Sequence, residues 1–263
     1  MNLNLAQTAA TRAAQAVGAL MRRELHAPKR AQSVSQHDIK LELDVRCQKL
    51  IERSLKRAFP EVALLGEEGV AGRANAEYRW VVDPIDGTVN FTYGIPHACV
   101  SIALQKRAPH RPDYRDGYDT LVGVVYEPFC RELWTAIRGQ PARLNGKTIH
   151  VSQRRKLREA VVSIGFTKTR ESLEATLPYF SGLVHRVRKI RMMGSAALGL
   201  TYVACGRFDA YIEREIHTWD IAAGGLIIQC AGGEFRREAL SSPHKYRVTA
   251  SNGLLRRSLR VPH

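Results

Sequence analysis

The spacing of hydrophobic and polar residues predicts two helices in the first 60 residues. Residues 4–25 are rich in alanine, place apolar side chains at helical spacing, and are followed by Pro28. Apolar side chains recur with the same period from about Asp38 to Phe59, and Pro60 ends that segment. We therefore expect two amphipathic helices ahead of the first strand.

Short apolar segments after these helices predict β-strands, because they are rich in Val, Ile, Leu and Tyr. The expected strands are residues 80–82, 98–106, 121–127 and 132–138. Asn145-Gly146 is typical of a hairpin turn. Residues 107–119 contain two prolines, a glycine and mixed charges, so we expect an extended hairpin tip there.

From residue 151 onwards the pattern alternates between strand and helix. The expected elements are a strand at 160–166, a helix at 171–185, a strand at 188–192, a helix from Ser195 to Gly206, a strand at 208–213, a helix at 218–230 and a strand at 246–250. The sequence thus predicts an α/β protein with an α+β half (1–150) and an α/β half (151–263). No repeat or low-complexity linker separates the halves, so we expect one compact catalytic unit.

Composition excludes several classes of protein. With 44% hydrophobic and 25% charged residues, the 263-residue chain has the balance of an ordinary globular protein, not of a disordered or collagen-like one. The 40 Lys and Arg outnumber the 25 Asp and Glu, which gives a net charge of +15. Such a charge attracts nucleic acid, acidic membrane surfaces or phosphorylated small molecules, and does not choose among them.

The five cysteines lie in separate segments and form no CxxC pair. An odd, scattered set is typical of reduced thiols in a cytosol. No basic segment followed by a long apolar stretch opens the sequence, and no apolar stretch reaches the ~18 residues of a membrane span. We therefore expect a cytoplasmic protein without a membrane segment.

The strongest chemical signal is the nine-residue motif at 83–91, with the sequence DPIDGTVNF. The expected strand delivers Asp83 and Asp86 at its end, Gly87 allows close approach of the backbone to a ligand, and Thr88 can cap a following helix. Carboxylates beside free helix N–H groups suit a divalent cation bridged to phosphate. The alternative is a turn in which an Asp caps a helix, but the full string favours function.

Two further acidic segments are weaker signals on their own. Glu67 and Glu68 lie between glycines, a pattern more typical of solvated surface. Asp220 follows Trp219 at the start of an apolar helix, where it could simply favour the helix dipole. Such a carboxylate is costly to bury unless it is paired or binds a metal.

The motifs GEE at 66–68, DPIDGTVNF at 83–91 and WDIAAG at 219–224 resemble, in this order and spacing, the inositol monophosphatase family of Mg²⁺-dependent, lithium-sensitive phosphatases. The resemblance runs from about Asp38 to Gly253. It implies a layered αβαβα sandwich of the sugar-phosphatase type, two to three Mg²⁺ ions and a homodimer. The family's D-x-V-T-x-x-D segment differs here, because Leu41 replaces the threonine.

The resemblance also implies a role for each matching residue. The metal ligands would be Glu67, Asp83, the carbonyl of Ile85, Asp86 and Asp220. The residues that orient the attacking water would be Glu67, Thr88 and Asp44. The substrate-binding residues would be Asp86, Gly87, Thr88, Gly194, Ser195, Ala196 and Glu213. Four carboxylates would repel one another without cations, so we expect Glu67, Asp83, Asp86 and Asp220 to converge on one site.

The expected activity is Mg²⁺-dependent hydrolysis of inositol monophosphate or a similar polyol phosphate. Histidinol phosphate and fructose 1,6-bisphosphate remain alternative substrates. Adenosine bisphosphates are less favoured by the resemblance, because the similar enzymes that act on them tend to carry Lys-Glu where this chain has Val89-Asn90. The net charge also fits a second class of function, a basic protein associated with RNA or transcription, although no RNP or KH motif is present. The apolar strand at 98–106 and the family pattern lead us to expect a homodimer.

Overall fold

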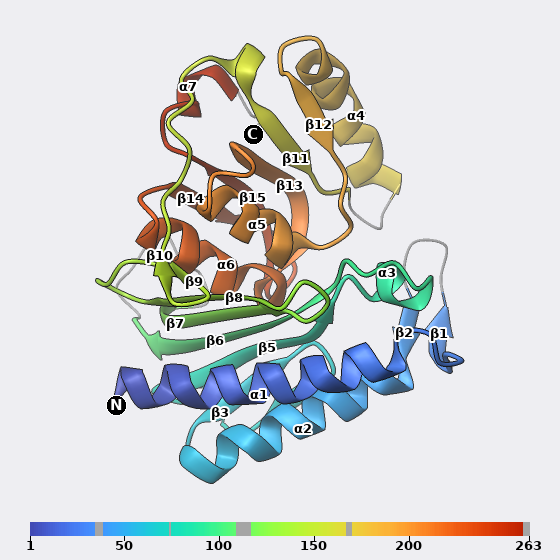
Figure 1. The fold of residues 1–263 in the computed structure, drawn as a ribbon, viewed down its shortest axis with the longest axis vertical. Helices are drawn as coiled ribbons and strands as arrows, with labels where there is room; N and C mark the ends of the chain where they lie inside the picture. The colour runs from blue at the N-terminus through green and yellow to red at the C-terminus, as the bar shows by residue number, and fades with distance from the viewer. Residues whose placement is uncertain (35–38, 74, 109–116, 167–169, 260–263) are drawn as a thin grey trace.

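The helices and sheets of the chain stack in five layers, helix–sheet–helix–sheet–helix (Figure 1). The computed structural model describes residues 1–34, 39–73, 75–108, 117–166 and 170–259. From the first helical layer to the last, the helices are α1 (Leu3–Glu24) and α2 (Glu42–Ala58), then α5 (Ala196–Ala204) and α6 (Thr218–Cys230), then α4 (Arg170–Val184) and α7 (Arg256–Leu259). The predicted αβαβα sandwich is confirmed.

The larger sheet has eight strands in the order β10-β9-β8-β7-β6-β5-β3-β4. All neighbours are antiparallel except β3 and β5, which are parallel. Its strands are β3 (Ala63–Gly66), β4 (Gly69–Ala71), β5 (Tyr78–Asp86), β6 (Cys99–Arg107), β7 (Tyr118–Glu127), β8 (Glu132–Ile137), β9 (Arg143–Leu144) and β10 (Lys147–Thr148). Asn145 and Gly146 both have positive φ, as the predicted hairpin turn requires.

The smaller sheet has five strands in the order β12-β11-β13-β15-β14. Parallel pairing of β11 with β12 and β13 gives way to antiparallel pairing at β15 and β14. Its strands are β11 (Val161–Ile164), β12 (Lys189–Arg191), β13 (Ala210–His217), β14 (Glu234–Ala239) and β15 (Lys245–Ser251). Four short elements lie outside the two sheets and the helical layers: the paired strands β1 (Ala31–Val34) and β2 (Ile39–Leu41), helix α3 (Thr88–Thr92) and the 3₁₀ turn Leu157–Glu159.

Three hydrophobic clusters bind the layers together. Trp80 and Ile102 lie in the cluster between α1, α2 and the larger sheet. Trp134 and Leu226 lie in the central cluster, where α5 and α6 separate the two sheets. Ile164 belongs to the third cluster, beneath α4 and α7. The side chains of β6 from Cys99 to Gln105 are buried within these layers, so the strand expected to mediate a dimer faces this chain's own core.

Two parts of the pattern-based prediction differ from the structure. Helix α2 begins at Glu42 instead of Asp38, because the Asp44 carboxylate accepts a hydrogen bond from the Leu41 amide at 2.8 Å and ends β2 there. Strands β1, β3, β4 and β14 were not expected; they are short or, in β14, rich in charged residues. Most of the predicted hairpin tip at 107–119 lies outside the described residues.

Among the described helices, none combines the length and the hydrophobicity that crossing a bilayer would require.

The contact between α6 and the larger sheet depends on a glycine. A Cβ atom added to Gly123 of β7 would lie 2.7 Å from the Ala223 carbonyl oxygen of α6. We expect Gly123→Ala to lower the free energy of unfolding by about 1–3 kcal/mol, because backbone must shift to relieve this contact. Thermal melting measures the loss.

Gly182→Ala is the matched control, because Gly182 lies in α4 and a Cβ there meets no atom within 4 Å. It should raise stability by up to ~1 kcal/mol through helix propensity. Equal melting temperatures for Gly123→Ala and the wild type would show that α6 does not pack this closely on β7.

Candidate active site

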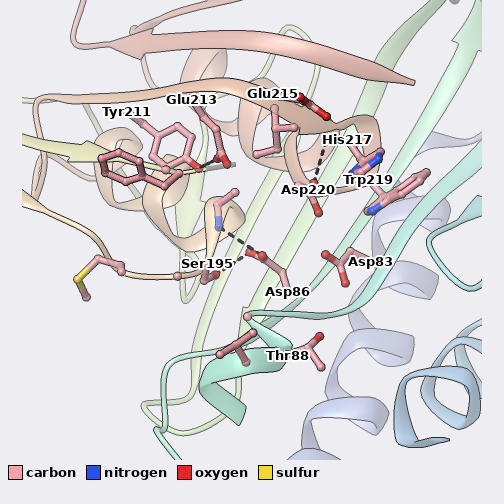
Figure 2. Close-up of a pocket in the computed structure, with 18 of the residues that line it drawn as sticks. Asp83, Asp86, Thr88, Ser195, Tyr211, Glu213, Glu215, His217, Trp219 and Asp220 are labelled. Atoms are coloured by element: carbon pink, nitrogen blue, oxygen red, sulfur yellow. Dashed lines mark hydrogen bonds between the residues drawn. The ribbon is translucent and has the colours of Figure 1, made fainter. Parts of the chain in front are cut away.

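A cavity of about 300 Å³ opens where β5 of the larger sheet and β13 of the smaller sheet end, beside the first turns of α5 and α6 (Figure 2). The polar residues that line it include Glu67, Asp83, Asp86, Thr88, Ser163, Ser195, Tyr211, Glu213, Glu215, His217, Asp220 and Lys245. Apolar side chains such as Phe166 and Met193 complete its wall. The cavity thus gathers residues from both halves of the chain.

A β-bulge in β5 places the two carboxylates of the DPID motif on the same side. Asp83 pairs with Ser101 and Asp86 with Cys99, so β5 has one residue more than β6 across this interval. In a regular strand, side chains three residues apart point to opposite faces, and one extra residue reverses that alternation. Pro84 lies in the bulge, where its missing N–H costs no ladder hydrogen bond.

The first turn of α5 binds the carboxylate of Asp86. The Ser195 hydroxyl donates to Asp86 Oδ2 at 2.6 Å (Figure 2). The Ala197 amide donates to the same oxygen at 2.7 Å. The Ala196 amide lies 3.3 Å from Asp86 Oδ1. The side chain of Ser195, predicted to face the substrate, is therefore directed at a carboxylate and also caps α5.

Asp220 reaches the same place from α6. It occupies the third position of the helix, and its Oδ2 accepts the amide of His217 at 3.0 Å. Asp83 Oδ1 accepts the amide of Ile85 at 3.0 Å. One carboxylate oxygen from each of Asp83, Asp86 and Asp220 lies within 4.8 Å of the other two. The structure therefore brings these three residues together, as expected from the sequence.

The electrostatics of this cluster favour a bound cation. Burial raises the pKa of Asp83 well above its ordinary range, and the charges of Glu67, Asp86 and Asp220 raise it further. Burial, followed by Asp86 and Glu67, also raises the pKa of Asp220. The pKa of Asp86 is raised by burial despite its hydrogen bonds from Ser195 and α5. A close set of carboxylate oxygens is the ligand type that Mg²⁺ prefers, so the residues fit the ion.

Glu67 lies in the tight turn between β3 and β4, at the edge of the cluster. Its amide donates to the Val82 carbonyl at 3.1 Å, and its side chain lines the cavity. Gln48 of α2 supports the turn, because it accepts the Glu68 amide at 2.9 Å and donates to the Gly69 carbonyl at 3.1 Å. The GEE motif is therefore part of the cavity and not only solvated surface.

Gly87 and Thr88 line the cavity directly after Asp86. Gly87 has φ of 96° and is itself the N-cap of α3, a role expected for Thr88. A Cβ at Gly87 would lie 3.0 Å from the His97 carbonyl oxygen and 3.2 Å from that of Gly194. The Thr88 hydroxyl donates instead to the Ile85 carbonyl at 2.8 Å, which leaves that oxygen a second lone pair for a metal.

Glu213 of β13 lies across the cavity from Thr88 (Figure 2). It accepts a hydrogen bond from the buried Tyr211 hydroxyl, and burial together with the Glu213 charge raises the pKa of Tyr211 well above its usual range. A Cβ on Gly165 would lie 2.2 Å from Glu213 Oε2, so only glycine leaves room for this carboxylate. Gly194, with φ of 71°, and Ala196 also line the cavity.

Asp44, predicted to orient water, does not line the cavity formed by the described residues. It is buried in the first turn of α2, where it accepts the Leu41 amide. Asp44 therefore has a visible structural function at the helix start.

Two residues that support the site, Gln48 and Asn90, were assigned no role from the sequence. Gln48 lies on the buried face of α2 beside Cys47, and a polar residue on that apolar face was the available signal. Asn90 donates to the carbonyls of His97 at 2.9 Å and Met193 at 2.8 Å, which ties the DPIDGT segment to the segment before α5. Its place within the 83–91 motif could have suggested such a contact.

The layered fold and the acidic cavity define a class of α/β protein with a cluster of carboxylates that could hold a metal ion. The chain belongs to the inositol monophosphatase family, which it matches over residues 3–259. Family membership supports phosphatase activity.

The relatives of this chain include inositol monophosphatases and proteins named Nus factor SuhB. The chain is 39% identical to inositol monophosphatase 2 of Solanum lycopersicum, over 85% of this chain and 84% of that protein. It is 41% identical to the Nus factor SuhB of Xylella fastidiosa, over 76% of this chain and 69% of that protein. The solved structure of an inositol monophosphatase from Anabaena is similar with a TM-score of 0.84 and 32% identity, over 98% of this chain and 95% of that one.

Replacement of Asp83 by asparagine should stabilise the metal-free protein at pH 7. Because the pKa of Asp83 is raised, the folded metal-free chain binds more protons than the unfolded chain. The ionised Asp83 carboxylate therefore destabilises the folded metal-free chain at pH 7. This destabilisation decreases as the pH falls towards the raised pKa. Asparagine can still accept the Ile85 amide while removing the charge. We expect a gain of at least ~1 kcal/mol, the equivalent of one pKa unit.

Melting in EDTA at pH 7 and pH 5.5 measures this gain, which should shrink at the lower pH. Added Mg²⁺ should raise the melting temperature of the wild type more than that of Asp83→Asn. Asp119→Asn is the control, because Asp119 forms an ion pair with Arg138 at 2.6 Å and its loss should not stabilise. A lower melting temperature for Asp83→Asn in EDTA would contradict the repulsion described here.

Proposed function

We propose that the chain hydrolyses the phosphate monoester of inositol or of a similar polyol in a Mg²⁺-dependent reaction. The observation that supports this most is the convergence of Asp83, Asp86 and Asp220 beside Glu67 in one cavity. Water adds to phosphorus and the bond between phosphorus and the ester oxygen breaks, so the products are inorganic phosphate and the free alcohol. Bound Mg²⁺ would activate the water and neutralise charge that develops on the leaving oxygen.

The residues at one end of the cavity would bind the metal ions in this reaction. Asp83, Asp86, Asp220, Glu67 and the Ile85 carbonyl would bind two to three Mg²⁺ ions, since they supply the oxygen ligands at one end of the cavity. The hydrogen bonds to Asp86 from the first turn of α5 would keep its carboxylate in one orientation.

The phosphate would lie against the amides of Gly87 and Thr88, because both residues line the cavity at the N-terminus of α3. Glu67 and Thr88 would orient the attacking water. Asp44 stays in this proposal as an indirect contributor, because it sets the start of α2, whose Gln48 supports the Glu67 turn.

The alcohol would lie between Gly194, Ala196 and Glu213. The Glu213 carboxylate can accept hydrogen bonds from hydroxyl groups, which favours a polyol. Ser195 contributes through Asp86 and would not contact the alcohol with its hydroxyl. Histidinol phosphate and fructose 1,6-bisphosphate are the remaining alternatives within the same chemistry.

A phosphate-release screen with Mg²⁺ tests the proposal. It compares inositol phosphates, histidinol phosphate, fructose 1,6-bisphosphate and adenosine bisphosphate as substrates, with EDTA as the metal-free control. We expect the highest kcat/KM for inositol monophosphate. Release that continues unchanged in EDTA, or the absence of release from every ester, would overturn the proposed reaction.

Asp220→Asn should abolish turnover and leave the fold intact. Asparagine can still accept the His217 amide, so the start of α6 should form as before. The loss of an anionic ligand should cost several kcal/mol of transition-state stabilisation, where each ~1.4 kcal/mol is tenfold in rate. Phosphate release and thermal melting are measured on the same preparation. Near-normal turnover at saturating Mg²⁺ would remove Asp220 from the metal ligands.

We propose that two copies of the chain form a homodimer through an apolar patch beside the cavity. Val89, Tyr93, Ile95 and Met192 are exposed, and the hydrogen bonds of Asn90 link the two segments that carry them. Such exposed apolar residues are typical of an interface. Light scattering should give twice the 29.4 kDa mass of the chain, and Tyr93→Glu should shift it towards the monomer. A 29.4 kDa particle at micromolar concentration would contradict the dimer.

A role with nucleic acid is the second candidate function, favoured by the net charge of +15. Arg154, Arg155 and Lys156 line a shallow surface pocket next to Gly206, at the end of α5 remote from Ser195. A basic surface of this kind binds polyanions without sequence preference, so we limit this candidate to nonspecific attraction.

A further inference from the structure

The cavity contains an ion pair that has no place in the reaction described above. Lys245, the first residue of β15, pairs with Glu215 of β13, and both side chains line the cavity. Figure 2 places Glu213 and Glu215 on the side opposite Thr88, with Asp220 and Asp86 between them. A phosphate ester bound near Thr88 would therefore extend its alcohol towards this side.

The backbone fixes the pair where it lies. Glu213 pairs with Val248 and Ile216 with Tyr246, so β13 has one extra residue in this interval, a β-bulge. The bulge lies beside Glu215, and Glu213, Glu215 and His217 all line the cavity.

The loop that precedes Lys245 is anchored as well. The Thr218 amide at the start of α6 donates to the His244 carbonyl at 2.9 Å. The side chains of Lys245 and Glu215 are only 28% and 20% exposed. The ion pair is thus attached to the same helix that carries Asp220 and is shielded from bulk solvent.

The distribution of charge along the cavity is uneven. Among the described residues that line it, Lys245 is the one lysine or arginine, whereas the acidic residues are Glu67, Asp83, Asp86, Glu213, Glu215 and Asp220. Four of these six form the end assigned to metal binding. At the other end, Lys245 is neutralised by Glu215, and Glu213 leaves one net negative charge.

We propose that the Glu215–Lys245 pair selects an uncharged polyol as the leaving group and disfavours substrates with a second phosphate. This inference rests on the proposed phosphatase function and narrows its substrate class. A closed ion pair offers N–H donors and carboxylate acceptors to hydroxyl groups without a net charge of its own. A second phosphate would instead meet the net negative charge that Glu213 leaves at this end of the cavity, and like charges in a shielded site repel strongly.

The test compares two esters on the same ring, inositol 1-phosphate and inositol 1,4-bisphosphate, in the wild type and in Glu215→Gln. Glutamine removes one negative charge and frees the ammonium of Lys245 for the second phosphate. The ratio of kcat/KM for monophosphate over bisphosphate should fall about tenfold, the change that ~1.4 kcal/mol produces. Lys245→Gln should change the ratio in the opposite direction.

Glu238→Gln is the matched control. Glu238 forms an ion pair with Arg247 at 3.2 Å on the neighbouring strands β14 and β15, and it does not line the cavity. The same chemical change there should leave the ratio unaltered. Thermal melting of all three variants checks that each is folded under the assay conditions.

The outcomes separate this inference from the proposed function. Hydrolysis of the monophosphate by the wild type, with an unchanged ratio in Glu215→Gln, overturns the role of the pair and leaves the phosphatase function intact. A wild type that prefers the bisphosphate also overturns it. Hydrolysis of neither ester overturns this inference, and the proposed function fails with it if no other ester of the screen is hydrolysed either.

Discussion

The mutual repulsion of three buried carboxylates is the constraint around which this molecule is arranged. Asp83, Asp86 and Asp220 converge within 4.8 Å, and burial raises the pKa of each. The chain offsets part of this cost with backbone donors at the ends of its elements, namely the amides of Ile85, Ala197 and His217. Those donors exist only where a strand ends or a helix begins, so the layers must meet at this point. A cation would supply the rest of the compensation.

β-Bulges shape both strands that reach the cavity. In β5 the bulge reverses the alternation of side chains, so that Asp83 and Asp86 face the same cavity despite their odd spacing. In β13 it lies between Glu213 and Ile216, beside Glu215. Both sheets thus have a β-bulge beside the cavity. A regular β5 would have turned either Asp83 or Asp86 away from the cavity.

The charge of the chain is divided between its outside and its cavity. The net charge is +15, yet six carboxylates and one lysine line the cavity among the described residues. Residues 151–263 contain 19 Lys and Arg against 9 Asp and Glu, so their surface is strongly basic. A positive surface raises the local concentration of anionic esters. The acidic cavity, by contrast, would repel the same esters in the absence of a bound cation.

The sequence alone determined the layered fold and the short-range part of the site. Hydrophobic periodicity located most helices and strands, because burial on one face imposes a period of 3.6 or 2 on nearby residues. The 83–91 motif identified Asp83 and Asp86 because both residues lie within one short segment of the sequence. Short or polar strands such as β4 and β14 left too weak a pattern to predict.

Only the tertiary structure decided how distant residues contact one another. The family resemblance predicted that Asp220 joins Asp86, which lies 134 positions earlier, but no local pattern states that α6 begins beside the end of β5. The direction of the Ser195 hydroxyl towards Asp86, the support of the Glu67 turn by Gln48, and the pairing of Glu215 with Lys245 likewise depend on how the two sheets pack. Sequence periodicity reports which side of an element is buried, whereas the partner across the interface is set by the packing of all five layers.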